Sequence, residues 1–408
     1  MNTITATAAG TGAPAAQRPA SPGRRPRTRL ARAAGAARTT LAPYQAALFR
    51  IAFAAVVTAF LLREWPHRRV LYGDRSPLSF DMALALLREG GGFTVLSWWG
   101  GRTWFEAVYA LTIAASLAVL VGWRTRTASV FLLVGVVSLE NRNTLVGDGG
   151  GNIIRIMVIY LVFVRCSQVW SLDARRARGR GDRNIPDRTG VALWSVAGLL
   201  LLWAFGPGTL LAPGWPLLLW TLWAVHGLWY TVNRRLPGHH LRTLLDGCAA
   251  MVHNCALLVI AVQVCLIYST AGWYKIQGGR WQEGSALHYV LRLDYFTPWP
   301  WLSGALAANA VLVVLLGHLT VVLQVAFPFT LFSRVKNVLL VALIAEHLGI
   351  AILLGIPFLS LIMVACDALF LPSALLLRLG PRCAAPLRWT AGRLRGRTAR
   401  PSAGPAGP

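Results

Sequence analysis

Long apolar runs separated by short polar stretches dominate the pattern of the chain. Ten runs are long enough and poor enough in charge to be read as membrane-spanning helices, since about 20 apolar residues cross a bilayer core. They lie at about 44–62, 104–122, 127–145, 152–169, 190–206, 210–231, 245–270, 303–327, 336–355 and 357–374. The pattern predicts an all-α fold, a polytopic membrane helix bundle with about ten spans.

The segments outside these runs define the expected domain organisation. Residues 1–43 are rich in Ala, Pro, Arg and Gly without an apolar core, which predicts a disordered basic tail rather than a signal peptide. Residues 44–374 form the expected transmembrane domain, with an extra hairpin at about 190–231. Residues 375–408 repeat the composition of the first segment and are expected to be a basic cytoplasmic tail.

The distribution of Arg among the loops predicts the orientation. Most loop Arg fall at 124–126, 175–188, 234–242 and 334–336 and in the two tails, while the alternate loops are poorer in Arg. The positive-inside rule then favours an even number of spans in the cell membrane, with both termini cytoplasmic. The loop 63–103 opposes this pattern with six Arg, but its segment LSFDMALALLREG is amphipathic and predicts an interfacial helix.

Composition agrees with a membrane protein and excludes other partners. Hydrophobic residues make up 55% of the chain and charged residues only 13%, with a mean hydropathy of +0.53; soluble domains carry about 25% charged residues. The net charge of +25 does not indicate nucleic acid, because Arg is spread over tails and loops instead of one folded face. Anionic membrane lipids are the expected partners of these charges. The six Cys form no CxxC pair, so we predict no metal site.

Ionisable residues inside the spans are candidates for function, since each costs about 2.5–3.5 kcal/mol at the centre of a spanning helix. They comprise Arg50, Glu140, Arg155, Asp246, His253, His318, Glu346, His347 and Asp367. Structural interpretations compete: Arg50 and Asp367 are expected to reach the membrane surface, and Arg155 to pair with Glu140 or Asp148. The Glu346-His347 pair is the better functional candidate, because an acid and a base near the middle of a span need a polar cavity.

Lys275 is unusual in this chain. Lys275 and Lys336 are the only lysines among 40 basic residues. Lys336 begins a span beside Arg334, where a membrane-surface anchor explains it. Lys275 follows the 245–270 run among Trp273, Tyr274 and Trp281. Poorly solvated Lys can release its proton and act as a base, whereas Arg effectively cannot. Lys275 therefore has either a chemical role or a chance placement.

Three segments carry a resemblance to a known family. WSLD at 170–173, IYSTAGWYKIQGGRWQEG at 267–284 and EHLGIAILLGIPFLSLIM at 346–363 resemble the membrane domain of the vitamin K-dependent γ-carboxylase family. Bacterial members form its horizontally transferred transmembrane (HTTM) group. The similarity runs in order and pattern from about 45 to 372 and is sharp only in these segments.

The resemblance implies a chemistry for Lys275 and His347. In the family, a lysine of the second segment is the base that starts the reaction of a reduced quinone, of the vitamin K or menaquinol type, with oxygen. The strong base so formed removes a proton from a glutamate γ-carbon, to which carbon dioxide adds. Lys275 matches that lysine, and His347 matches a histidine of the third segment. The expected substrate- or quinone-binding residues are Glu346, Trp281, Glu283, Asn141, Asn143, Arg155 and His253.

The sequence also departs from the family pattern. Carboxylases have an Asn-His pair before the WSLD helix, whereas here Asn141 and Asn143 are followed by Arg142 and Thr144. The spacing from Lys275 to Trp281 is one residue longer. The family's large luminal β-rich domain, which docks protein substrates, has no counterpart in this sequence, so the mammalian protein substrate is not implied.

Two functions of different classes remain open. The first is a quinol-dependent, carboxylase-like membrane enzyme that modifies a small secreted peptide or a lipid at the outer face. The second is a non-catalytic membrane factor that binds a lipid, a peptide or a partner protein, for example in export or maturation of a secreted peptide. A transporter is disfavoured, because the sequence contains neither an internal repeat nor a repeated pair of broken helices.

Overall fold

The expected all-α class is confirmed. The computed structural model describes residues 39–180, 187–204 and 214–378, and within these ranges every regular element is a helix. Most of the two basic tails, residues 1–38 and 379–408, lies outside the described part of the chain.

Each of the ten apolar runs contains a helix. These are α2 (Pro43–Glu64), α5 (Arg102–Val121), α6 (Thr125–Arg142), α7 (Gly149–Leu161), α9 (Arg188–Ala204), α10 (Gly214–Arg235), α11 (His240–Gln277), α15 (Ala310–Ala326), α16 (Val335–Leu353) and α17 (Pro357–Asp367). Shorter helices connect them: α3 (Arg68–Leu71), α4 (Phe80–Gly90), α8 (Leu172–Arg180), α12 (Gly279–Gln282), α13 (Ala286–Val290) and α14 (Pro300–Ala307).

Five helical segments of the described chain are long and apolar enough to span a membrane, which indicates a membrane protein. They are Pro43–Glu64, Arg102–Val121, His240–Gln277, Ala310–Thr330 and Val335–Leu353. Others fall short of the roughly 20 residues that a span needs: α7 has 13 residues and α17 has 11. The helices of the described chain thus support five spans by length and composition, and the expected count of about ten is not confirmed.

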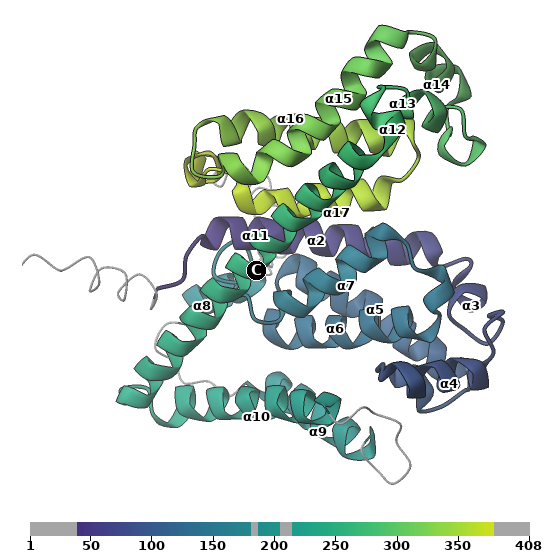
Figure 1. The fold of residues 1–408 in the computed structure, drawn as a ribbon. Helices are drawn as coiled ribbons and strands as arrows, with labels where there is room; N and C mark the ends of the chain where they lie inside the picture. The colour runs from purple at the N-terminus through teal and green to yellow at the C-terminus, as the bar shows by residue number, and fades with distance from the viewer. Residues whose placement is uncertain (1–38, 181–186, 205–213, 379–408) are drawn as a thin grey trace, which may run out of the picture.

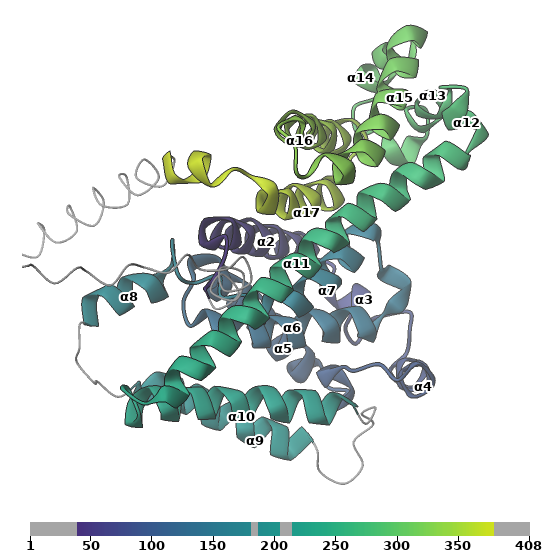
Figure 2. The ribbon, with the colours of Figure 1, turned by 60° about the vertical axis from the view of Figure 1, so that its left-hand side comes forward.

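Helix α11 organises the whole molecule. It runs obliquely from the α9–α10 hairpin, past α2 and α7, to the α12–α15 group (Figures 1 and 2). Its 38 residues correspond to about 57 Å at 1.5 Å per residue. This length is nearly twice a hydrocarbon core of about 30 Å, so α11 is longer than a span requires.

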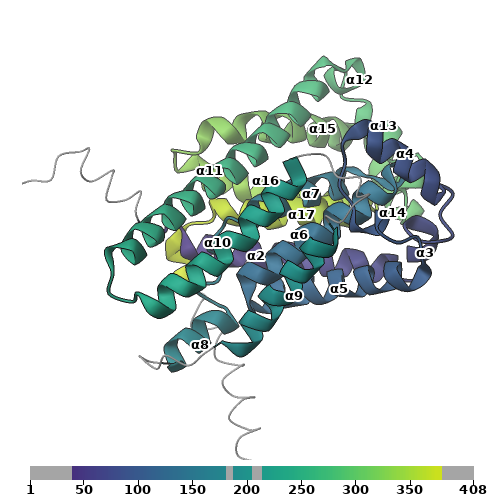
Figure 3. The same ribbon diagram turned by 90° about the horizontal axis from the view of Figure 1, so that it is seen from below.

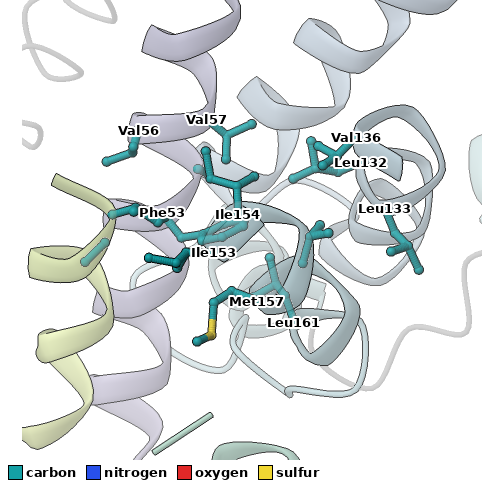
Figure 4. Packing of buried hydrophobic residues seen from close by; sticks show 14 of the residues in the cluster. Phe53, Val56, Val57, Leu132, Leu133, Val136, Ile153, Ile154, Met157 and Leu161 are labelled. Carbon is teal, nitrogen blue, oxygen red and sulfur yellow. The ribbon is translucent and has the colours of Figure 1, made fainter. Parts of the chain in front are cut away.

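Part of the hydrophobic core lies among α2, α6 and α7. Side chains from all three helices interdigitate there, as Figure 4 shows for Phe53, Val57, Leu132, Ile154 and Met157. Helix α17 closes the cluster from the other side of α2 and α7. The core holds α2, α6, α7 and α17 together, and α11 packs against α7 and α17.

Arg50 and Asp367 do not reach a surface, so the expectation that they would extend toward the membrane surface was wrong. Both side chains are 0% exposed. Arg50 lies in α2 and donates to the carbonyls of Val119 and Leu120, at 2.7 and 3.0 Å, and to that of Trp170 at 2.7 Å. The last carbonyls of a helix have no partner within it, so Arg50 supplies one for the C-terminal end of α5.

The WSLD segment supports the same junction. Asp173 accepts hydrogen bonds from the backbone N–H groups of Arg124 and Thr125, each at 2.8 Å, and so caps the start of α6. Gly122, at φ 70°, ends α5, and a Cβ atom there would collide with Ser171 and the Arg50 guanidinium. The WSLD segment, one of the three that resemble the family, thus stabilises the α5–α6 junction.

The loop between α2 and α5 contains a helix where the amphipathic segment predicts one. Helix α4 begins after Ser79, whose hydroxyl accepts from the N–H of Met82 at 3.2 Å. Nearby, Arg69 donates to both carboxylate oxygens of Asp74, at 2.9 and 2.6 Å. These bonds lower the pKa of Asp74 to about 2.

Helices α9 and α10 form a hairpin against the lower face of the molecule (Figure 3). The indoles of Trp194 and Trp223 stack with centroids 4.0 Å apart. Each indole N–H donates to the other residue's carbonyl at 2.9 Å. This reciprocal pair fixes the two helices together.

Candidate functional site

Lys275 belongs to a polar chain that links three helices. Its Nζ donates to Gln324 Oε1 of α15 at 2.8 Å, and Gln324 Nε2 donates to Glu346 Oε1 of α16 at 2.6 Å. A longer bond of 3.4 Å runs from Nζ to the Ala271 carbonyl. Glu346 therefore reaches Lys275 through an amide, and no carboxylate of the described chain forms an ion pair with Lys275.

A second polar group lies beside this chain. His347 is 7% exposed, and its ring centroid lies 5.8 Å from that of Tyr268 in α11. The Tyr268 hydroxyl donates to Asp367 Oδ2 of α17 at 2.9 Å. Tyr268 also meets Phe327 edge to face, with centroids 5.6 Å apart. Four helical segments thus bring an acid, a base, a phenol and an amine into one region.

Several buried polar atoms of this region have no hydrogen-bond partner among the described residues. They are Glu346 Oε2, both ring nitrogens of His347 and Asp367 Oδ1. Buried polar groups are nearly always satisfied, and leaving one unpaired costs about 1–3 kcal/mol. Such a concentration is typical of a region that binds a polar ligand or water.

The helix positions explain why these residues meet. Residues 268, 272 and 275 recur at helical spacing and therefore face the same side of α11. Gly272 in that row allows close approach, because a Cβ atom there would lie 3.3 Å from the backbone nitrogen of Val325 and 3.5 Å from Gln324 Cβ. The α11–α15 contact therefore places Gln324 within reach of the Lys275 amine.

The aromatic surroundings expected for Lys275 are only partly present. The Trp281 ring lies 5.4 Å from Nζ, within range of a cation–π contact. Trp273 and Tyr274, however, are 59% and 73% exposed. Adjacent helical residues point about 100° apart, so Trp273 and Tyr274 are turned away from the row that carries Lys275.

The two asparagines expected near the quinone lie elsewhere. Asn141 donates to the Phe93 carbonyl at 2.8 Å, and Asn143 donates to that of Leu71 at 2.7 Å. Arg142 between them donates to the Leu78 carbonyl at 3.0 Å. The three side chains fasten the loop between α2 and α5 onto the end of α6.

The remaining candidates have other partners or are exposed. Arg155 donates to Asn152 Oδ1 at 2.9 Å and forms no ion pair with Glu140 or Asp148, contrary to expectation. Both ring nitrogens of His253 are used, since one accepts from the Arg165 N–H and the other bonds the Leu41 carbonyl, each at 2.9 Å. Glu283 is exposed beside α12.

Sequence reasoning missed Gln324 and Tyr268. An uncharged amide within the run 303–327 and a tyrosine near the end of 245–270 carry little cost in an apolar segment, so neither stood out. Gln324 is the only Gln, Asn, Asp, Glu, Lys or Arg between 310 and 333. A single amide in such an apolar stretch is the sequence signal that could have identified Gln324.

Fold and site together define a helical protein, with five helices able to cross a membrane and a buried polar cluster shared by α11, α15, α16 and α17. Comparisons with protein-family models, curated proteins and solved structures gave no match to the chain. The resemblance to the γ-carboxylase family therefore stays a prediction.

Proposed function

We propose that the protein is a carboxylase-like membrane enzyme of the HTTM type, which uses a reduced quinone and oxygen to modify a peptide or a lipid. The observation that carries this proposal is the Lys275–Gln324–Glu346 chain, with His347 buried beside it. It links Lys275 to Glu346, the neighbour of His347, so the lysine and the histidine that the resemblance marks as functional lie in one region although they are 72 residues apart by numbering.

The environment of Lys275 suits a base. A carboxylate in direct contact would hold the side chain as an ammonium ion, whereas the Gln324 amide accepts a hydrogen bond without that charge. One N–H of a neutral amine can then donate to Gln324 Oε1 while the nitrogen lone pair stays free to take a proton. Glu346 holds the amide in this orientation by accepting from its Nε2.

The cluster also fits the two hydroxyl groups of a reduced quinone. Glu346 Oε2 and the His347 ring are buried, unpaired acceptors that could receive hydroxyl hydrogens. The bound quinol would supply the electrons for oxygen reduction. Lys275 would take the proton that starts the reaction, and His347 and Glu346 would orient the ring.

The proposed placement has ten spans, both termini cytoplasmic and the end of α11 near Lys275 toward the outer face. Its support is the Arg bias of the loops, together with helices in all ten runs. A substrate would then arrive after export, as a secreted peptide, or from the outer leaflet, as a lipid.

Exchange of Lys275 tests the proposal. Arg keeps the charge but cannot give up its proton, so Lys275→Arg should be as inactive as Lys275→Ala, with at least a hundredfold loss, the usual size of general-base catalysis. The measurement is quinol consumption by membranes that contain equal amounts of each variant. Lys336→Arg is the matched control. Full activity of Lys275→Arg would exclude the base role and favour the non-catalytic membrane factor.

A further inference from the structure

A large cavity lies away from the Lys275 region. It has a volume of about 930 Å³ and is bounded by α5 and α6 on one side and by α9, α10 and α11 on the other. Pockets for small ligands measure about 300–1,000 Å³, so this cavity is at the upper end of the range. None of the residues of the Lys275 cluster lines it.

The walls of the cavity are apolar over most of its length. Aromatic and aliphatic side chains from four helices form them, among them Trp104, Phe131, Trp194, Leu201 and Leu222. Trp104 lies near the start of α5, whereas Arg124 and Arg126 follow its end. At 1.5 Å per residue these ends are about 25 Å apart, longer than the roughly 15 Å occupied by the chains of one membrane leaflet.

The far end of the cavity is basic. Arg126 and Arg165 both face the Trp229 ring, with guanidinium carbons 4.6 and 5.9 Å from its centroid. Arg165 pairs with Asp246 at 3.3 Å, and Arg124 pairs with Asp187.

Arg126 differs from its neighbours, because its guanidinium forms no hydrogen bond or ion pair with any described residue. His226 of α10 also lines the cavity. Its Nε2 atom is buried and has no hydrogen-bond partner within the described ranges. One positive charge and one buried polar atom are thus left unmatched at the same end.

We propose that this cavity holds one anionic phospholipid, with its phosphate on Arg126 and an acyl chain along the apolar walls. A phosphate oxygen would accept charge-assisted hydrogen bonds from the Arg126 guanidinium. A small soluble anion would leave the apolar length of the cavity unused. A zwitterionic lipid would bring a second positive charge beside Arg126 and Arg165.

Retention of lipid by the purified full-length protein tests the site. The probe is a detergent micelle containing equal amounts of phosphatidylglycerol and phosphatidylcholine, and the readout is native mass spectrometry. We expect one phosphatidylglycerol per wild-type chain, and about tenfold weaker retention in Arg126→Gln, as expected for loss of a charge-assisted contact. Arg178→Gln, which removes an exposed charge outside the cavity, should retain the lipid.

A second pair of variants tests the apolar part without changing charge. Ala197→Trp fills the cavity from α9 and should abolish retention, whereas Val196→Trp, one residue along on the exposed side, should not. Gel filtration would check that all variants stay folded. Equal retention of phosphatidylcholine, equal losses in Arg126→Gln and Arg178→Gln, or normal retention by Ala197→Trp would each overturn the proposal.

Discussion

At the scale of single residues, the uncharged Gln324 partner of Lys275 determines which protonation states are open to the lysine. The geometry of this contact would suit a Lys–Glu ion pair equally well, and Glu346 lies only one amide further away. An ion pair would favour permanent protonation of the amine. The amide instead allows the lysine to exist in either state, which is what a base requires.

Gln324→Glu is therefore expected to reduce quinol consumption without disturbing the packing of the helices. The substitution is nearly isosteric and places a carboxylate about 2.8 Å from Nζ. Because the ammonium form would then be favoured, quinol consumption at neutral pH should fall by about ten- to a hundredfold and recover as the pH is raised. The measurement is the pH profile of the initial rate.

Gln324→Leu provides the contrast for that experiment. It removes the hydrogen bond without adding charge, so its profile should keep the wild-type pH dependence at a reduced rate. If Gln324→Glu showed a wild-type rate and profile, Lys275 would not need to lose its proton, and Gln324 would only hold the helices together.

At the scale of elements, side chains from neighbouring segments satisfy the buried helix ends. Arg50 from α2 supplies donors to the last turn of α5, and Asp173 supplies acceptors to the first turn of α6. Both contacts satisfy backbone groups that a buried helix end leaves unpaired. The short α5–α6 connection at Gly122 is stable because these two side chains converge on it.

Replacement of Arg50 by Met should destabilise the protein strongly. It would leave the carbonyls of Leu120 and Trp170 without their donor, while that of Val119 keeps the Gly122 N–H, at about 1–3 kcal/mol for each buried group that stays unpaired. We expect a loss of roughly 3 kcal/mol or more, measured as a lower midpoint of thermal unfolding in detergent. Arg63→Met, at the exposed end of the same helix, is the matched control and should change the midpoint little. Equal midpoints for the two variants would contradict the capping role.

At the scale of the whole molecule, the oblique path of α11 relates the two regions of interest. Its first half borders the cavity beside α10, and its last turns carry Tyr268 and Lys275. The two regions are thus near opposite ends of one helix of 38 residues. In the proposed orientation, the basic end of the cavity faces the cytoplasm and Lys275 lies toward the outer face.

Single cysteines would test this orientation. In a variant whose six native Cys are replaced by Ala, a Cys at Gln277 should react with an impermeant thiol reagent added to intact cells. A Cys at Gly179 in α8 should react only after the membrane is opened. Both positions are exposed, so accessibility within the protein is matched. Labelling of position 179 in intact cells would reverse the proposed topology.

The sequence by itself determined the helical class and the position of each apolar helix, because long apolar runs have no other stable form within a membrane. It also marked Lys275, Glu346 and His347, since charged groups in such runs are costly and rare. Only the tertiary structure decided the partners of those groups. Gln324 and Tyr268 gave little local signal, and Arg50 was expected at a surface. The hydrogen-bond partners of these side chains depend on how α11 packs on α15 and α2 on α5. Such contacts join residues far apart in the chain, so no local pattern reveals them.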